Sequence, residues 1–175
     1  MTDDSRKILT GRERTFSPDT FIVSKTDKKG IITYANDVFL EIADYQLHEV
    51  IGKPHNMIRH PGMPRCIFKT LWDQIGQSRE IFAYVVNRTK FGDHYWVLAH
   101  VTPSFDAHGN IVGYHSNRRA PKPETIKTIE PFYRKLRSIE DSAGNVRDGI
   151  ELSSKELHNW IQDNGGNYDE LILSL

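Results

Sequence analysis

Arg59 and His60 place a permanent cation beside a titratable one within the segment NMIRHPGMP. Pro61 and Pro64 restrict the backbone and Gly62 permits a sharp turn, so a stiff cationic corner is expected. Pro64 suits the first position of a helix, and the start of a helix favours a negatively charged group nearby. A planar guanidinium also binds phosphate well. The segment therefore predicts an anion site, most simply for phosphate; the alternative is an exposed loop with solvated side chains.

The chain has eight histidines and one cysteine, Cys66. A single cysteine excludes an intrachain disulfide and a cysteine-cluster metal site. The histidines show neither the paired helical spacing nor the Cys–His spacing that binds zinc, so we expect no metal site. A haem held by one histidine, His55 or His60, is the alternative. No nucleophile, base and orienting acid occur together in a recognisable motif, so we expect no enzyme.

Five segments rich in β-branched and aromatic residues predict the strands that support the corner: 20–26, 31–34, 81–88, 94–102 and 111–118. Glycine-containing turns of hairpin length join the first two strands and the last three. Between the two groups, Asn36 can cap a short helix, and residues 47–51 suggest another helical turn. A longer helix follows the corner and ends at Gly76, because apolar residues recur on one face: Ile67, Phe68, Leu71, Trp72 and Ile75.

This order of elements predicts an α+β fold, in which an antiparallel sheet carries short helices on one face. A cavity between the sheet and these helices is the natural place for a small ligand. From residue 122 the pattern changes to amphipathic helices, which begin near Pro123 and Val146 and are followed by a short apolar end. Two short helices cannot form a core of their own, so we expect them to pack on the domain, on a second copy or on a partner.

Composition narrows the class of protein. Lys plus Arg and Asp plus Glu are both 23, so the formal net charge is zero and a nucleic-acid partner is not expected. No apolar run approaches the roughly 20 residues that cross a bilayer. The polar opening MTDDSRK lacks the apolar region of a signal peptide. We therefore expect a cytoplasmic protein without direct membrane insertion.

Three separated blocks, GKPHNMIRHPGMP, then Phe68 with Trp72, then VNRTKFGDHYWV, resemble the FAD-binding PAS domains of bacterial aerotaxis receptors over roughly residues 20–135. The resemblance implies a five-stranded antiparallel PAS sheet with FAD held noncovalently between sheet and helices. It also implies a role in energy taxis, in which the flavin reports electron transport to chemotaxis signalling. The predicted division is an N-terminal arm (1–18), a PAS sensory domain (19–121) and a helical extension for signalling or dimerisation (122–175).

The predicted cofactor-binding residues combine this resemblance with local chemistry: Asn36, Arg59, His60, Met63, Phe68, Trp72 and Asn87. The Arg59 guanidinium could pair with a pyrophosphate while Phe68 and Trp72 offer flat apolar surfaces. Gly62 and Ile81 depart from the family pattern, which has Asp and Trp there. Cys66 lies in PRCIF, unlike the NCRFLQ signature of light-sensing relatives that form a cysteinyl adduct, so it is predicted to be a small apolar residue.

Together these observations predict a cytoplasmic FAD-binding PAS sensor of redox, oxygen or energy state that signals to a separate chemotaxis transducer by protein contact. Polar side chains on the sheet, among them Asn87, His100 and Ser116, are the candidates for groups that respond to flavin reduction. The alternatives are a haem-binding PAS gas sensor and a ligand-free PAS adaptor that acts through its helices. A homodimer is an open alternative for the assembly.

Overall fold

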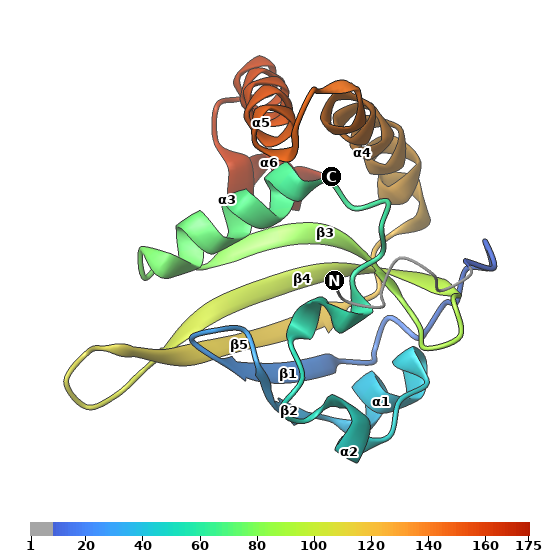
Figure 1. The fold of residues 1–175 in the computed structure, drawn as a ribbon, viewed down its shortest axis with the longest axis vertical. Coiled ribbons are helices and arrows are strands. Elements are labelled where there is room, and N and C mark those ends of the chain that lie inside the picture. The colour runs from blue at the N-terminus through green and yellow to red at the C-terminus, as the bar shows by residue number, and fades with distance from the viewer. Residues whose placement is uncertain (1–8) are drawn as a thin grey trace.

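The computed structural model describes residues 9–175, which form a central sheet, short helices on one face and three C-terminal helices (Figure 1). The strands are β1 (Ile22–Asp27), β2 (Ile32–Ala35), β3 (Ile81–Arg88), β4 (His94–Phe105) and β5 (Ile111–Arg119). Their order in the sheet is β2-β1-β5-β4-β3, and every neighbouring pair is antiparallel. The predicted α+β fold with a five-stranded antiparallel sheet is confirmed.

The chain between β2 and β3 supplies the helical layer: α1 (Asp37–Ala43), α2 (Leu47–Val50), the 3-10 helix η2 (His55–Ile58) and α3 (Arg65–Gly76). Asn36 caps α1 as predicted, because its side chain accepts a hydrogen bond from the Phe39 N–H. Apolar side chains from the sheet and the helices meet in one core, whose fully buried members include Ile22, Phe39, Ile58, Ile67 and Val97. This core fixes the distance between the helical layer and the sheet.

The start of α3 differs from the prediction. Pro64 is the residue before the helix, not its first residue, since its ψ of 137° is extended and the helix begins at Arg65. Pro64 can hold this conformation because the restriction on φ that proline imposes is compatible with extended backbone as well as with helix. The predicted end at Gly76 is confirmed. Figure 1 shows α3 lying along the sheet next to β3.

The C-terminal helices α4 (Pro123–Ser142), α5 (Val146–Asp163) and α6 (Tyr168–Ser174) pack on the domain itself, against α3 and β3 (Figure 1). The Tyr133 hydroxyl donates to the Tyr84 carbonyl at 2.8 Å, and the Phe82 N–H donates to Asp169 Oδ1 at 3.2 Å. Because β3 lies at the edge of the sheet, its outward backbone groups would otherwise be open to a foreign strand. The helices therefore protect this edge.

The N-terminal segment, as far as it is described, is extended rather than helical. The Thr10 N–H donates to the Gly92 carbonyl at 3.0 Å, and the Arg14 N–H donates to the His94 carbonyl at 2.7 Å. Residues 10–14 therefore run alongside the turn between β3 and β4. The predicted arm covers residues 1–18, of which 1–8 lie outside the described residues.

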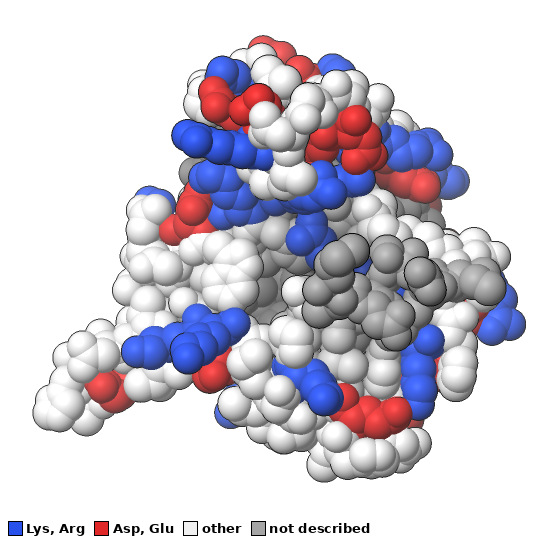
Figure 2. All heavy atoms as spheres, viewed as in Figure 1, with Lys and Arg blue, Asp and Glu red and all other residues white. Residues whose placement is uncertain are grey.

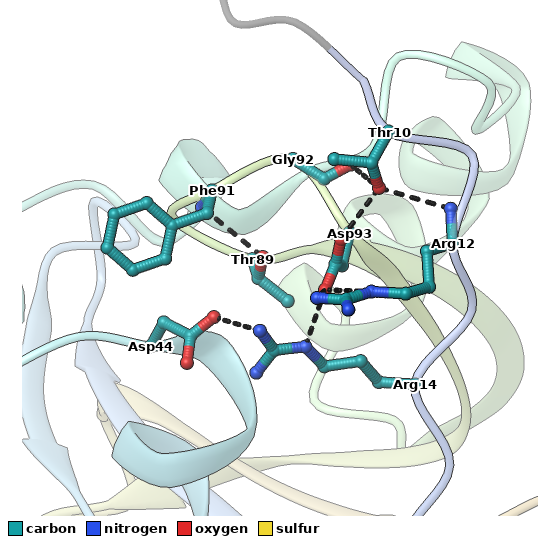
Figure 3. Close-up of polar contacts among 8 residues, drawn as sticks. All are labelled: Thr10, Arg12, Arg14, Asp44, Thr89, Phe91, Gly92 and Asp93. Atoms are coloured by element: carbon teal, nitrogen blue, oxygen red, sulfur yellow. Dashed lines mark hydrogen bonds and ion pairs between the residues drawn. The ribbon is translucent and has the colours of Figure 1, made fainter.

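Asp93 fastens this segment to the domain, as Figure 3 shows. Its carboxylate accepts hydrogen bonds from Arg12, Thr10 and Arg14, with the Thr10 hydroxyl at 2.6 Å and Arg14 Nε at 2.8 Å. Arg14 also reaches Asp44, at the end of α1, with a distance of 2.5 Å between Nη2 and Oδ2. The hydrogen bond from Arg12, followed by those from Thr10 and Arg14, holds the pKa of Asp93 well below its usual range.

Among residues 9–175, no helix is long and apolar enough to span a bilayer. The same residues contain no group of three or more His, Cys, Asp or Glu side chains placed to hold a metal ion.

Candidate functional site

A cavity of about 250 Å³ lies between the sheet and the helices η2 and α3, where the sequence predicted a ligand site. Its apolar wall includes Phe68, Leu71, Trp72, Ile75, Val85 and Val101. Its polar groups include Ser24, His55, Arg59, Asn87, Ser116 and Arg118. A mainly apolar wall with a few convergent polar groups is typical of small-molecule sites.

Arg118 is a buried cation on the cavity face of β5, with 2% of its surface exposed. Its guanidinium donates to Ser24 Oγ, to Ser116 Oγ at 2.9 Å and to His55 Nε2 at 3.0 Å. Its Nη1 is buried and has no hydrogen-bond partner among residues 9–175. Burial lowers the pKa of Arg118 to about 10, so the side chain is still charged at neutral pH. A buried donor without a partner is costly, and a ligand acceptor in the cavity would satisfy it.

His55 is held as the neutral base beside Arg118. Because an arginine can only donate, Nε2 of His55 must be the accepting nitrogen and carries no proton. Burial, and secondly the positive charge of Arg118, lowers the pKa of His55 to about 3. Its Nε2 is engaged by Arg118 and Ser24, at 3.0 and 3.1 Å, so a haem iron would have to displace both groups. The geometry therefore disfavours His55 as an axial ligand.

Arg59 also lines the cavity and lies on the segment that links η2 to α3. Its guanidinium carbon lies 4.0 Å from the centre of the Phe68 ring, a cation–π contact. The backbones of Arg59 and Asn87 form an isolated antiparallel bridge, which fixes this segment to the edge strand β3. Burial, and secondly the charge of Arg65, lowers the pKa of Arg59 to about 10. The side chain is thus a partly desolvated cation beside an aromatic surface.

Trp72 forms part of the rim of the cavity, with 43% of its surface exposed. Its ring meets Tyr114 of β5 edge to face, with centroids 5.4 Å apart. It also covers Gly30 in the turn between β1 and β2, where an added Cβ would lie 3.2 Å from the indole. Gly30 has a φ of +78°, which disfavours other residues as well. The turn, α3 and β5 thus meet at this aromatic pair.

Of the seven predicted cofactor-binding residues, four line the cavity: Arg59, Phe68, Trp72 and Asn87. The other three, Asn36, His60 and Met63, do not line it, and each forms hydrogen bonds with backbone groups elsewhere in the fold. Asn36 accepts from the Val23 and Phe39 N–H groups and donates to the Phe21 carbonyl. Met63 is fully buried, and its sulfur accepts from the Val86 N–H at 3.3 Å.

His60, the third of these residues, lies beside His94, with ring centroids 5.7 Å apart. Its Nδ1 accepts from the Gly62 N–H at 3.1 Å, which closes the turn of the cationic corner. Burial, and secondly His94, lowers the pKa of His60 to about 4, so it contributes no positive charge at neutral pH. Of the permanent cation and the titratable group predicted at this corner, Arg59 is thus charged at neutral pH and His60 is a neutral imidazole.

Of the three polar sheet residues proposed to respond to a flavin, two line the cavity and one does not. Asn87 and Ser116 line the cavity. His100 lies on the opposite face of the sheet, where it stacks on Phe82 at 4.2 Å and contacts Glu80 at 2.7 Å. Alternation along a strand sends neighbouring residues to opposite faces, so residues 99 and 100 cannot both meet one ligand.

Residues 32–118 match the family model described as the PAS fold. This range includes β2, β3, β4, most of β5 and the helices between β2 and β3, while β1 lies just before it. These residues belong to the PAS family. A light-state structure of the blue-light photoreceptor Aureochrome1 LOV superimposes with a TM-score of 0.55 and 22% identity, covering 62% of this chain and 85% of that one. At this identity the likeness supports the PAS fold alone.

Curated relatives of the PAS domain include the aerotaxis receptor of Escherichia coli K12, which is 39% identical over 157 residues. This match covers 90% of the present chain but 30% of the receptor. Since 157 of 175 residues align, the similarity reaches beyond the predicted limit near residue 135 and includes part of α5. Phototropin-1A of Oryza sativa is 29% identical over 80 residues, which is 46% of this chain and 9% of that protein.

The anion expected at the start of α3 in this PAS domain is supplied by the protein itself. The Cys66 N–H, in the first turn of the helix, donates to Glu140 Oε1 of α4 at 3.0 Å. Cys66 is fully buried, and burial raises the pKa of its thiol to about 11. It does not line the cavity, which agrees with its prediction as a small apolar residue.

Arg118 is the main PAS cavity residue that the sequence analysis missed. The signal was present, because Tyr114, Ser116 and Arg118 share one face of a strand by alternation. An arginine in such a pattern normally points to solvent, and only the pairing of β5 between β1 and β4 places it inside. His55 was considered only as a haem ligand, and its hydrogen bond to Arg118 was not predictable from spacing.

Proposed function

We propose that this protein is a cytoplasmic PAS sensor of redox, oxygen or energy state, which binds FAD noncovalently in the cavity and signals to a chemotaxis transducer. The similarity to the aerotaxis receptor supports this reading over most of the chain. The chain spans 30% of that receptor, so the signalling partner and the response are part of the proposal. The proposal includes no catalytic reaction.

The observation that carries the proposal is the buried guanidinium of Arg118, which lines a cavity with aromatic walls and has one nitrogen, Nη1, without a hydrogen-bond partner among residues 9–175. A ligand that fits this site needs a flat apolar body and an edge that accepts hydrogen bonds. An isoalloxazine ring has both, since one side is hydrocarbon and the other carries carbonyl oxygens and ring nitrogens. Arg118 would hold the accepting edge, and Phe68 and Trp72 would cover the ring.

The size of the cavity agrees with partial enclosure of such a ligand. Its volume of about 250 Å³ lies below the roughly 300–1,000 Å³ of sites that enclose a whole drug-sized molecule. A ring system would therefore be enclosed while the phosphate-bearing arm extends past the rim. Arg59, which lines the cavity, is the cation that we assign to that arm, because a guanidinium binds phosphate well.

When bound, the flavin would supply a redox-active ring whose charge and protonation change on reduction. The protein residues would respond through hydrogen bonds. Arg118 favours an edge with negative charge, and Asn87 can reorient its amide to donate or accept. His55 shares Arg118 with the ligand, so a stronger bond from Arg118 to the ligand would weaken its bond to His55. Such rearrangements are the proposed origin of the signal.

The visible absorption spectrum of the purified full chain, recorded in air and after anaerobic reduction, tests the proposal. We expect the two-banded spectrum of a flavin that bleaches on reduction, and FAD on release by denaturation. Arg59→Ala and Arg118→Gln should each reduce flavin occupancy while circular dichroism stays that of a folded protein. Arg119→Gln is the matched control, since Arg119 is the exposed neighbour that packs on Phe21 and does not line the cavity.

Three results would contradict the proposal. A single intense Soret band would identify the cofactor as haem, although His55 Nε2 is already hydrogen-bonded to Arg118 and Ser24. A colourless protein that takes up no added FAD would favour a ligand-free PAS adaptor. Full flavin occupancy in both Arg59→Ala and Arg118→Gln would remove the assigned roles of these residues.

A further inference from the structure

The lining of the cavity is positively charged. Among the described residues that line it, three are lysine or arginine, and none is aspartate or glutamate: Lys29, Arg59 and Arg118. Arg118 is buried, Arg59 is partly exposed and Lys29 is exposed, so the positive charges extend from the interior of the cavity to the surface. Cations of one sign repel one another, and an anion among them is stabilised. The lining therefore favours a ligand that carries negative charge at its exposed end.

Residues that line the cavity and are also exposed mark its mouth. They include Lys29, in the turn between β1 and β2, Asn56, in η2, and Trp72, in α3. Figure 2 shows basic side chains at the turn between β1 and β2, whose sequence contains Lys28 and Lys29. Lys28 does not line the cavity. The mouth thus carries a cation that the sequence analysis did not assign to the site.

Backbone hydrogen bonds place three polar residues of the mouth side by side. The His55 N–H donates to the Gly30 carbonyl at 2.9 Å, so the next residues along each segment, Lys29 and Asn56, flank this bond. The Arg59 N–H then donates to the Asn56 carbonyl at 3.0 Å. Lys29, Asn56 and Arg59 therefore follow one another along one edge of the cavity, although 30 positions of sequence separate the first from the last.

The turn that carries Lys29 has a fixed backbone. Oδ1 of Asp27 accepts from the Lys29 N–H at 2.8 Å and from the Ile31 N–H at 2.9 Å. The indole of Trp72 covers Gly30, the residue that follows Lys29. The carboxylate of Asp27 does not line the cavity. The backbone of Lys29 is thus held in place, while its exposed side chain is able to meet a ligand at the mouth.

We propose that Lys29, Asn56 and Arg59 form a diphosphate-binding subsite at the mouth of the cavity, by which this site selects FAD over FMN. This inference rests on the proposed function, since it requires a flavin ring in the cavity. Arg59, which packs on Phe68, binds the phosphate nearer the ring, and the more exposed Lys29 binds the second phosphate. The amide of Asn56 can donate between them. FMN ends at the first phosphate and leaves Lys29 without a partner in the ligand.

The test compares the dissociation constants of riboflavin, FMN and FAD for the full chain and its variants. Lys29→Gln should weaken FAD about fivefold, the upper end of what an exposed ion pair contributes, and should leave riboflavin and FMN unchanged. Lys28→Gln is the matched control, because it removes the same charge one residue away from an exposed side chain that does not line the cavity. It should leave all three constants unchanged. Lys29→Arg keeps the charge and should retain FAD binding.

The dependence on salt gives a second readout of the same contact. Raising the ionic strength should weaken FAD binding more in the unaltered chain than in Lys29→Gln, because screening acts on the charge that the variant has lost. The same salt dependence in both proteins would contradict a role for Lys29 in binding phosphate.

Two further results would overturn the inference while leaving flavin binding intact. An equal loss of FMN and FAD affinity in Lys29→Gln would put Lys29 at the phosphate that the two ligands share. An equal effect of Lys28→Gln and Lys29→Gln on FAD would mean that the turn acts only through its total charge. If the unaltered chain binds none of the three ligands, the proposed function fails and the inference fails with it.

Discussion

The polar interior of the cavity depends on one arginine and its neighbours. Arg118 donates hydrogen bonds to Ser24, Ser116 and His55, and its Nη1 has no partner among the described residues. His55 tolerates this position only as the neutral imidazole, because a second positive charge beside Arg118 in a desolvated site is unfavourable. Protonation of His55 must therefore oppose folding.

The pH dependence of stability tests this arrangement. The pKa of His55 is about 3 in the folded protein and near 6.5 when unfolded, so the unfolded state binds more protons between these values. Stability should fall as the pH decreases from 6.5, by at most about 1.4 kcal/mol per pH unit from this group. Urea unfolding of wild type and His55→Gln at several pH values isolates the effect, because the variant should lose that part of the slope.

His48→Gln is the matched control for this measurement, since His48 is exposed on α2. It should retain the slope of the wild type. If His55→Gln and the wild type decline in parallel with acidification, His55 is not held neutral in the fold.

Among the elements, the edge strand β3 and the helix α3 make the most extensive contacts with the C-terminal helices. Tyr133 and Asp169 satisfy outward backbone groups of β3, and Glu140 satisfies an N–H at the start of α3. Hydrogen-bonding groups at the edge of a sheet and the end of a helix require partners, and the extension provides them for both elements. Close packing of α4 against α5 places Glu140 within hydrogen-bonding distance of the Cys66 N–H.

A glycine in α5 tests this packing. A Cβ at Gly149 would lie 2.7 Å from the Glu140 carbonyl oxygen, so Gly149→Ala should force α4 and α5 apart and cost about 1–3 kcal/mol. Alanine is intrinsically more favourable than glycine in a helix by about 1 kcal/mol. The sign of the change in unfolding free energy therefore shows whether the steric clash or the helix propensity is larger. Gly144→Ala, between the two helices with nothing within 4 Å, should be close to neutral in the same urea unfolding experiment. A stabilised Gly149→Ala would refute the close approach.

In the whole molecule, the N-terminal segment and the C-terminal helices both pack against the PAS domain. The N-terminal segment is fastened to Asp93, and the C-terminal helices bury Ile129, Tyr133 and Leu136. The predicted boundaries at residues 18 and 121 are still a prediction about function. The packing indicates that the last segment also contributes to stability.

A chain that ends at residue 121 should therefore be less stable than the full chain. It would expose Tyr84 and Trp96, which are now covered, together with the free edge of β3. We expect a lower Tm and self-association through the uncovered surface, measured by thermal unfolding and by light scattering during size-exclusion chromatography. A monomer with an unchanged Tm would mean that the extension is an independent appendage.

Periodic patterns made most of the fold predictable. The alternation of β-branched residues located all five strands, and the stripe from Ile67 to Ile75 located α3 with its end at Gly76. The exact start of α3 was wrong by one residue, because proline is compatible with both sides of a helix boundary. The packing of the C-terminal helices stayed open, since an amphipathic face does not specify its partner.

At the candidate site, the sequence by itself determined the chemistry available: a cationic corner with Arg59, aromatic residues on one helix face, and an amide on β3. The tertiary structure decided which of these groups meet. Asn36, His60 and Met63 were predicted beside the ligand but lie away from the cavity, where they bond to backbone groups. Local sequence specifies a side chain and its face, whereas its neighbours depend on strand pairing and helix packing between distant residues. Arg118 with His55, and Glu140 with Cys66, are pairs of that kind, separated by 63 and 74 positions in the chain.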